Sequence, residues 1–171
     1  MELVRLLQSD GTWEKLREEW RNQTLSFNED FESYASGMFS VVSSLAEHRT
    51  RNAGVFGLQR EGSFIALCQL NQTPLPGYDS PVLRMRFMTL APQFDFGEFE
   101  LDQYVGVLIG LFSNVLLLSN SDDEFGAKHL KFHLRSPADR QFFAAVATPL
   151  EKSEAFSSVQ VRGSWLYITK K

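Results

Sequence analysis

Residues 83–118 read LRMRFMTLAPQFDFGEFELDQYVGVLIGLFSNVLLL, and this stretch decides the fold. Its first residues alternate apolar with basic side chains and predict a strand, which Ala91-Pro92 ends. The nearly all-apolar run at 104–118 predicts a buried helix. Where a strand feeds the start of a helix, free backbone N–H groups and the positive end of the helix dipole attract anions. The geometry of the segment therefore favours an anion site.

The loop between this strand and this helix carries a charge that opposes an anion. Its acids and its one glycine are Asp95, Glu98, Glu100, Asp102 and Gly97. The acids near the helix start also suit its first turn, where each carboxylate stabilises the helix by about 0.3–1 kcal/mol. Both explanations stay open at this point, and neither agrees with an ordinary phosphate site.

Composition predicts one globular domain that covers residues 1–171. Hydrophobic residues make up 43% and charged residues 22% of the chain, as in ordinary soluble proteins. The net charge of −4 opposes non-specific nucleic-acid binding, so we expect no nucleic-acid partner. The single cysteine, Cys68, cannot form an internal disulfide and lies in an apolar run. It predicts a buried thiol and a cytoplasmic protein.

We expect neither a signal peptide nor a membrane span. Glu2 and Arg5 interrupt the apolar residues at the start of the sequence. The apolar run at 104–118 is shorter than the roughly 20 residues that a span needs. It also contains Ser113 and Asn114, which suit a helix buried against a sheet better than a helix in lipid.

Hydrophobic periodicity and turn residues around this segment predict six strands and four helices. The expected strands are 1–8, 53–60, 63–70, 83–90, 129–135 and 159–169. The expected helices begin at Thr12, after a capping box at Ser26, at Tyr104 and at Ser136, with Pro149 ending the last one. Glu61-Gly62 predicts a hairpin turn, and Gly163 predicts a bulge in the last strand.

The order β-α-α-β-β-β-α-β-α-β predicts an α+β fold with α/β/α layers. In such a fold a mixed, mostly antiparallel central sheet carries helices on both faces. No repeat and no linker divides the chain.

This order and three local stretches resemble the GNAT superfamily of N-acyltransferases over nearly the whole chain. Residues 55–70 look like the central hairpin of that family, and RFMTLAP at 86–92 looks like its fourth strand. Residues 130–146, with GSWL at 163–166, look like its fifth strand, last helix and closing strand. The resemblance implies a GNAT-like fold, an acyl-CoA donor such as acetyl-CoA, and a small-molecule or peptide amine as acceptor.

The resemblance also implies a set of cofactor-binding residues. In the family, the end of the fourth strand offers backbone groups to the pantetheine arm of acetyl-CoA, and here those groups belong to Met88, Thr89 and Leu90. A loop of the type Q/R-x-x-G-x-G/A then cradles the pyrophosphate. Gln93 fits its first position, and Gly97 follows one residue after the position of its first glycine.

The chain departs from the family pattern in the loop and in the last helix. Phe96 and Glu98 stand where the loop needs small residues, and their side chains block the close approach of backbone N–H groups to phosphate. The pyrophosphate loop is therefore degenerate. The tyrosine that protonates the departing thiolate is replaced by Phe143, which has no proton to donate. Tyr104 and Tyr167 replace it only if the fold happens to bring them there.

Glu98 and His133 are the candidate catalytic residues, as ionisable groups expected near the split of the sheet. We expect no metal site. His129 and His133 have suitable spacing for a metal, but zinc needs three or four ligands and the chain offers no cysteine partner.

Basic side chains alternate along two strands that the resemblance places side by side. They are Arg84, Arg86, His129, Lys131, His133 and Arg135. On one side of the sheet they form a site for an anion: an unusually bound acyl-CoA, a phosphorylated small molecule or an acidic protein segment. The alternative is that they pair with acids of a covering helix or face solvent. Arg84 and His133 on opposite sides of the sheet would contradict the anion site.

Two functions stay open. One is a divergent GNAT-like N-acyltransferase that moves an acyl group from acyl-CoA to an unknown amine, which follows from the fold by analogy. The other is a GNAT-fold binding or regulatory module without catalysis, in the form of a homodimer, which follows from the two departures. The aromatic content of 13% suits an apolar interface between its subunits.

Overall fold

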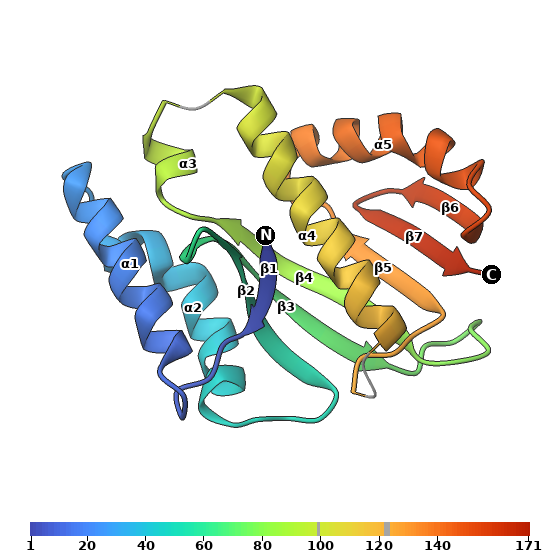
Figure 1. Cartoon of the computed structure of the whole chain (residues 1–171), viewed down its shortest axis with the longest axis horizontal. Helices are drawn as coiled ribbons and strands as arrows, with labels where there is room; N and C mark the ends of the chain where they lie inside the picture. The colour runs from blue at the N-terminus through green and yellow to red at the C-terminus, as the bar shows by residue number, and fades with distance from the viewer. Residues whose placement is uncertain (99, 122–123) are drawn as a thin grey trace.

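The computed structural model describes residues 1–98, 100–121 and 124–171 (Figure 1). The strands are β1 (Glu2–Arg5), β2 (Ala53–Arg60), β3 (Ser63–Thr73), β4 (Val82–Leu90), β5 (His129–His133), β6 (Phe156–Arg162) and β7 (Trp165–Lys170). The helices are α1 (Thr12–Ser26), α2 (Phe31–Glu47), α3 (Gln93–Phe96), α4 (Leu101–Ser121) and α5 (Pro137–Glu151). The strands form one sheet in the order β1-β2-β3-β4-β5-β7-β6.

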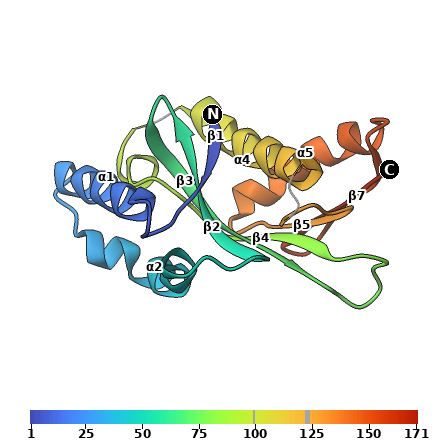
Figure 2. The ribbon, with the colours of Figure 1, turned by 60° about the horizontal axis from the view of Figure 1, so that its bottom comes forward.

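The sheet is mixed and mostly antiparallel, which confirms the predicted fold class. Among the described strands, only β4 and β5 pair in parallel. Figure 2 shows α1 and α2 on one side of the sheet and α4 and α5 on the other. Phe112 of α4 packs against Phe132 of β5 and Phe143 of α5, with ring centroids 5.1 and 5.7 Å away. On the other side, Trp20 Nε1 of α1 donates a hydrogen bond to Phe64 O of β3 at 2.9 Å.

Local signals explain the ends of several elements. Ser136 and Asp139 form the predicted capping box at the start of α5, with Pro137 at its first position. Glu61 and Gly62 have φ of +54° and +85° and form the predicted turn between β2 and β3. Both predictions are confirmed, and each could be made because it rests on residues within four positions of one another.

Other predicted boundaries were wrong. Helix α1 runs through Ser26, and Asp30 caps α2 instead by accepting the Ser33 N–H at 2.8 Å. Pro149 lies inside α5, because its missing N–H removes only one helical bond near the C-terminus of the helix. Gly163, with φ of +57°, lies in the turn of a β6–β7 hairpin and not in a bulge, so the expected last strand is two strands.

Helix α4 is longer than predicted, with 21 residues. By length and composition alone, its segment Leu101–Asn120 could cross a membrane, with a mean hydropathy of 1.6, although core helices of soluble proteins meet the same criteria. Gly110 lets the helix approach the sheet, since a Cβ there would lie 3.1 Å from Leu58 Cδ2. Ile109 and Leu117 remain 49% and 65% exposed. The helix therefore covers the sheet with one face and leaves apolar side chains on its outer face.

The feature that positions the functional site is the separation of β4 from β5. Their pairing runs from Val82 opposite His129 to Met85 opposite Phe132. Beyond Met85, β4 continues to Leu90 and stays paired with β3. The residues that follow β5 stay beside β7 and away from β4, because Ser164 O in the β6–β7 turn accepts the Leu134 N–H. A gap therefore opens between the ends of β4 and β5.

Candidate active site

A bulge in β4 marks the point where the gap opens. The register of β4 against β3 shifts between Leu67 and Gln69, so two residues of β4, Phe87 and Met88, lie opposite the single residue Cys68. Phe87 has φ of +49°, a left-handed conformation that side chains rarely adopt. The bulge bends β4 and re-aims the side chains that follow it.

The end of β4 turns backbone groups toward the gap. The Ala91 N–H bonds Ile65 O of β3 at 3.0 Å. Because backbone groups alternate along a strand, the N–H and C=O of Met88 and Leu90 then point away from β3 and into the gap. The predicted pantetheine-binding residues Met88, Thr89 and Leu90 thus share one strand end, and two of them face the gap with their main chain.

Two side chains already bond the carbonyl groups of this edge. Arg135, which follows β5, crosses the gap and donates from Nη1 to Met88 O at 2.8 Å and to Thr89 Oγ1 at 2.9 Å. Tyr34 of α2 donates its hydroxyl to Leu90 O at 2.6 Å. Burial raises the pKa of Tyr34 well above its ordinary value, so the hydroxyl keeps its proton.

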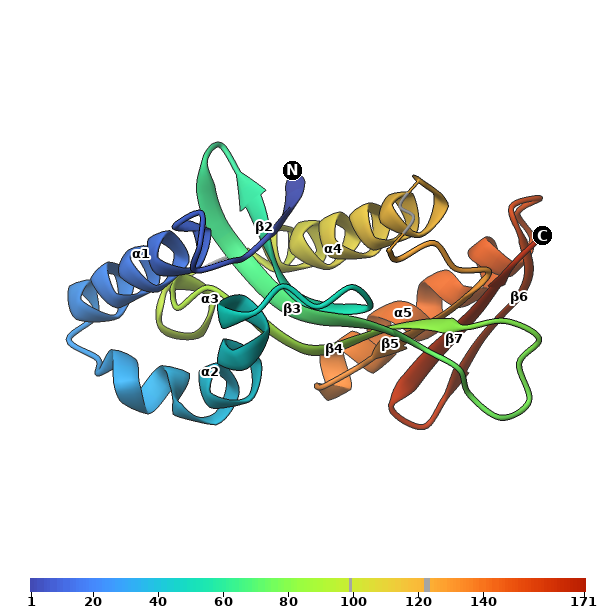
Figure 3. The same ribbon diagram turned by 90° about the horizontal axis from the view of Figure 1, so that it is seen from below.

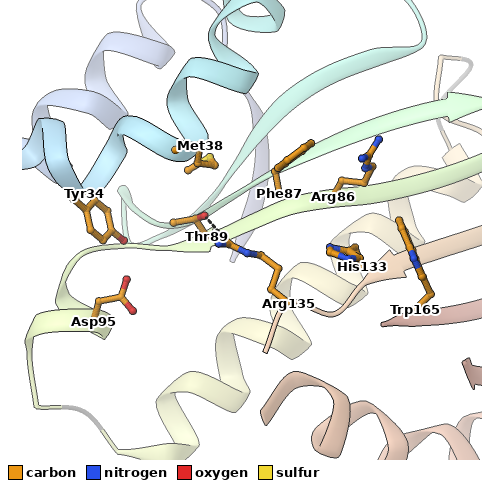
Figure 4. A pocket seen from close by; sticks show the side chains of 10 residues that line it. Tyr34, Met38, Arg86, Phe87, Thr89, Asp95, His133, Arg135 and Trp165 are labelled. Carbon is orange, nitrogen blue, oxygen red and sulfur yellow. Dashed lines mark hydrogen bonds between the residues drawn. The ribbon is translucent and has the colours of Figure 1, made fainter. Parts of the chain in front are cut away.

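A cavity of about 450 Å³ lies beside the gap on the α2 side of the sheet. Its lining includes Tyr34 and Met38 of α2, Arg86, Phe87 and Thr89 of β4, Asp95 of α3, His133, Arg135 and Trp165. Figure 4 shows Tyr34 and Asp95 at one end, Arg86 and Trp165 at the other, and Arg135 and His133 between them. This cavity brings the predicted residues His133 and Thr89 together.

His133 is held as a neutral imidazole. Burial, followed by the charges of Arg86 and Arg135, lowers its pKa below the ordinary 6.5. Its ring also packs against Trp165, with centroids 4.7 Å apart. A neutral imidazole in a cavity is a chemically competent proton acceptor near neutral pH.

The loop that was expected to cradle phosphate is instead the short helix α3. Its backbone N–H groups bond carbonyl groups within the same turn: Phe94 to Ala91 O, Asp95 and Phe96 to Pro92 O, and Gly97 to Gln93 O, all at 2.9–3.0 Å. Gly97 is needed for this turn, because a Cβ there would lie 2.5 Å from Gln93 O. The predicted residues Gln93 and Gly97 therefore lie together, but in a turn whose N–H groups are already bonded.

The second catalytic candidate, Glu98, lies away from His133. Its side chain is exposed and borders a separate hollow with Phe27, Arg60 and Gln103. The residues lining the cavity around His133 do not include it. The structure therefore separates the two candidates, one at the α3 end and one at the gap.

The two candidate proton donors, Tyr104 and Tyr167, lie in different places, and only Tyr104 contacts the start of α5. Phe143 is buried against Phe112, as its apolar ring requires. The Tyr104 hydroxyl donates to the Asp139 carboxylate, and burial followed by this hydrogen bond raises the pKa of Tyr104 to about 12. Tyr167 lies under the Lys131 ammonium, whose Nζ is 4.6 Å from the ring centroid. The contact between Tyr104 and Asp139, 35 positions apart, has no local signal in the sequence.

Comparison with known proteins places the fold. No family model matches the chain, and no curated protein matches its sequence. The GNAT domain of S. lividans PAT matches 97% of this chain and 87% of its own, with a TM-score of 0.53 and 12% identity. A probable acetyltransferase from Staphylococcus epidermidis ATCC 12228 matches 98% and 94%, with a TM-score of 0.51 and 12% identity. The protein therefore has the GNAT fold.

Proposed function

We propose that the protein is a GNAT-type N-acyltransferase that moves an acyl group from acyl-CoA, acetyl-CoA or another, to the amine of a small molecule or peptide. The observation that supports this most is the gap between β4 and β5, with the cavity beside it. One side of the gap offers backbone hydrogen-bonding groups, and the cavity offers a proton acceptor and room for a second molecule.

The end of β4 suits the pantetheine arm of the donor. The arm contains amide groups, and a strand edge with outward N–H and C=O groups binds an extended amide chain as an added strand. Met88 and Leu90 present these groups toward the gap. Arg135 and Tyr34 bond the two carbonyl oxygens, so the N–H groups of Met88 and Leu90 are the groups we assign to the donor.

The turn of α3 does not suit the pyrophosphate. Its N–H groups are used within the helix, and exposed Asp95 and Glu98 repel phosphate. We therefore assign the affinity for the donor to the pantetheine arm and give Gln93 and Gly97 only a structural part in forming the turn.

His133 is the residue we assign to proton transfer. The bound donor supplies a thioester carbonyl carbon. The acceptor ammonium first loses a proton to the neutral His133 imidazole, which exposes the nitrogen lone pair. The C–N bond then forms while the C–S bond breaks, the nitrogen loses its second proton, and one proton goes to the departing sulfur.

Calorimetric titration with acetyl-CoA and with desulfo-CoA, which lacks the reactive sulfur, tests this function. We expect both to bind, and we expect free thiol to appear when a panel of amines is added to acetyl-CoA. Leu90→Pro removes the N–H that faces the gap, while Leu90→Ala shortens the side chain and keeps that N–H. We expect the proline variant to bind desulfo-CoA up to about tenfold more weakly than the alanine variant, as expected for one lost hydrogen bond of up to about 1.5 kcal/mol.

Absence of both heat and thermal shift at millimolar ligand would contradict the proposal and leave the non-catalytic binding module. Circular dichroism of both Leu90 variants checks that they fold. The buried, unpaired thiol of Cys68 supports a cytoplasmic location. The homodimer stays a prediction, which light scattering on the purified protein measures.

A further inference from the structure

Beyond the cavity, the α2 side of the sheet carries a row of basic side chains. Arg84 of β4 lies opposite Lys131 of β5, so the two share one side, and alternation puts Arg86 and His133 on that side as well. The neighbouring Met85 and Phe132 point to the other side, under α4. Figure 3 shows α1 and α2 toward one end of the sheet, while β5, β6 and β7 extend toward the other end. Arg84 and His133 therefore share a face, as the anion site requires.

Acids reach one end of this face and not the rest of it, since His129, which shares the face with Lys131 and His133, bonds Asp79 Oδ1 through Nε2 at 2.5 Å. Ion pairs with Asp or Glu hold Arg5, Lys15, Arg17, Arg21, Arg49 and Lys128. Within the described ranges, no carboxylate lies within 4.0 Å of the side-chain nitrogens of Arg84, Arg86 or Lys131. In a chain of net charge −4, three neighbouring cations without an acid nearby are a local departure from the average.

The cations of this face differ in what they already contact. Lys131 Nζ lies 4.9 Å from the Trp165 ring and 4.6 Å from the Tyr167 ring, so it is held by both rings. Arg86 Cζ lies 5.1 Å from the ring centroid of Phe87 in the cavity wall. A guanidinium that stacks on a ring keeps its in-plane N–H groups for a carboxylate or a phosphate.

Polar atoms without partners lie next to the two arginines. Asn71 is opposite Arg84 and Gln69 is opposite Arg86 across the β3–β4 ladder. In the described part of the chain, Asn71 Oδ1, Gln69 Oε1 and Arg84 Nε are buried and have no hydrogen-bond partner. Buried polar atoms normally have partners, so unpaired donors and acceptors side by side indicate a polar ligand with both kinds of group.

We infer that the acceptor of this enzyme carries a carboxylate or phosphate in addition to its amine, and that Arg86, with Arg84 beside it, binds that anion. This inference rests on the proposed acyltransferase function. The Nη groups of the two arginines supply N–H donors to the anion.

The positions along β4 limit the length of the acceptor. Arg86 precedes Thr89, at the gap, by three strand positions, which is at most about 10 Å. An anion at Arg86 and an amine at the gap therefore fit one molecule the size of an amino acid or a dipeptide. A stacked nucleic acid fits less well, because Lys131 already covers the rings of Trp165 and Tyr167.

Matched probes test the inference without any donor. Calorimetry compares glycylglycine with glycylglycinamide, and phosphoethanolamine with ethanolamine, so that each pair differs in the anion alone. We expect the anionic member of at least one pair to bind about tenfold or more tightly, and the better pair distinguishes carboxylate from phosphate. Equal binding within both pairs would overturn the inference.

Variants then locate the site. Arg86→Gln removes the anion contact, whereas Arg162→Gln removes the same charge from exposed β6 on the same face. We expect Arg86→Gln to bring the two members of the better pair to within about twofold of each other, and Arg162→Gln to preserve their difference. Equal losses in both variants would show a general field and not a site, and would also overturn the inference.

The two proposals fail in different ways. Binding of desulfo-CoA without any preference for the anionic probes leaves the acyltransferase standing and removes the anionic acceptor. Binding of the anionic probes without any binding of acetyl-CoA removes the acyltransferase, and the site then does not hold an acceptor. With acetyl-CoA present, we expect Arg86→Gln to raise KM for the anionic amine about tenfold and leave the neutral amine unchanged.

Discussion

The end of β4 and the turn of α3 are adjacent in sequence but differ in what they preserve. At the strand end, the groups that face the gap belong to the main chain, so Met88 and Leu90 present them whatever their side chains are. In the turn, a phosphate cradle needs glycine at defined positions, and Phe96 and Glu98 occupy these. A site made by backbone groups therefore tolerates changes of side chain, whereas a site that depends on missing side chains is lost by one or two substitutions.

The largest effect should separate the two candidate bases, of which His133 lies across the gap from β4 and Glu98 follows α3. His133→Gln should lower kcat about 100-fold, because general base catalysis contributes at least that much. Glu98→Gln, in the exposed segment after α3, should leave kcat within about twofold. Steady-state kinetics with acetyl-CoA and one amine measures both, and a larger loss in the Glu98 variant would reverse the comparison.

The pH dependence of the rate tests the same role of His133. The lowered pKa of His133 keeps the imidazole neutral to a lower pH than an ordinary histidine. The rate should therefore be constant around neutrality and fall only as the pH drops through a midpoint below 6.5. His133→Gln should remove this acid limb, and a midpoint above 6.5 in the wild-type protein would contradict the assignment.

Shortened donors compare how much the end of β4 and the α3 turn each contribute to donor affinity, without any mutation. Acetyl-pantetheine, which lacks the phosphates and the nucleotide, should bind within about threefold of acetyl-CoA, because the α3 turn contributes little. S-acetyl-N-acetylcysteamine lacks the second amide, and losing the one hydrogen bond of that amide, worth up to about 1.5 kcal/mol, should weaken binding about tenfold. Calorimetry measures all three ligands. If removal of the nucleotide costs more than removal of the amide, α3 rearranges to bind phosphate.

A gain of function in the turn would sharpen the comparison. Phe96→Gly combined with Glu98→Gly restores small residues and removes a negative charge, so affinity for acetyl-CoA should rise about tenfold. Phe96→Ala with Glu98→Ala removes the same side chains without the freedom of glycine and serves as the control. Acetyl-pantetheine should bind the wild type and both double variants equally, and any gain for that ligand would argue against a phosphate effect.

The smallest effect concerns the side chain that crosses the gap. Arg135 bonds Met88 O, so it competes with the amide of the donor for this acceptor. Arg135→Met should therefore raise the affinity for neutral acetyl-pantetheine about threefold, at a cost in folding stability of about 1 kcal/mol. Thermal unfolding and calorimetry measure the two quantities. Weaker binding in this variant would mean that Arg135 contacts the donor itself.

The fold was predictable because its signals are local. The β2–β3 turn follows from Glu61-Gly62, and the start of α5 follows from Ser136 and Asp139. The end of the chain was harder, since Gly163 allows a left-handed conformation in a bulge and in a hairpin turn alike. Only the pairing of β7 with both β5 and β6 distinguishes the two.

The site was predictable only in part, because its contacts join distant residues. The contact between Tyr34 and Leu90 spans 56 positions and that between Arg135 and Met88 spans 47. Neither has a spacing that a sequence pattern reveals. The alternation of Arg84 and Arg86 with apolar residues was visible in the sequence. Whether acids of a helix pair with these arginines depends on how far α2 extends over the sheet, which the sequence does not reveal. The helical turn of α3 was also missed, because FDF reads as a strand or a loop as easily as a helix.

The left-handed conformation of Phe87 strains the backbone, while its ring contacts Arg86, so one position carries both a cost in stability and a contribution to the site. At φ of +49°, glycine is unstrained, so Phe87→Gly should be more stable than Phe87→Ala by about 1 kcal/mol, the reverse of their usual order in strands. Both variants lose the ring that supports Arg86. A library randomised at this codon should therefore favour glycine over alanine under selection for heat resistance, and phenylalanine over both under selection for turnover.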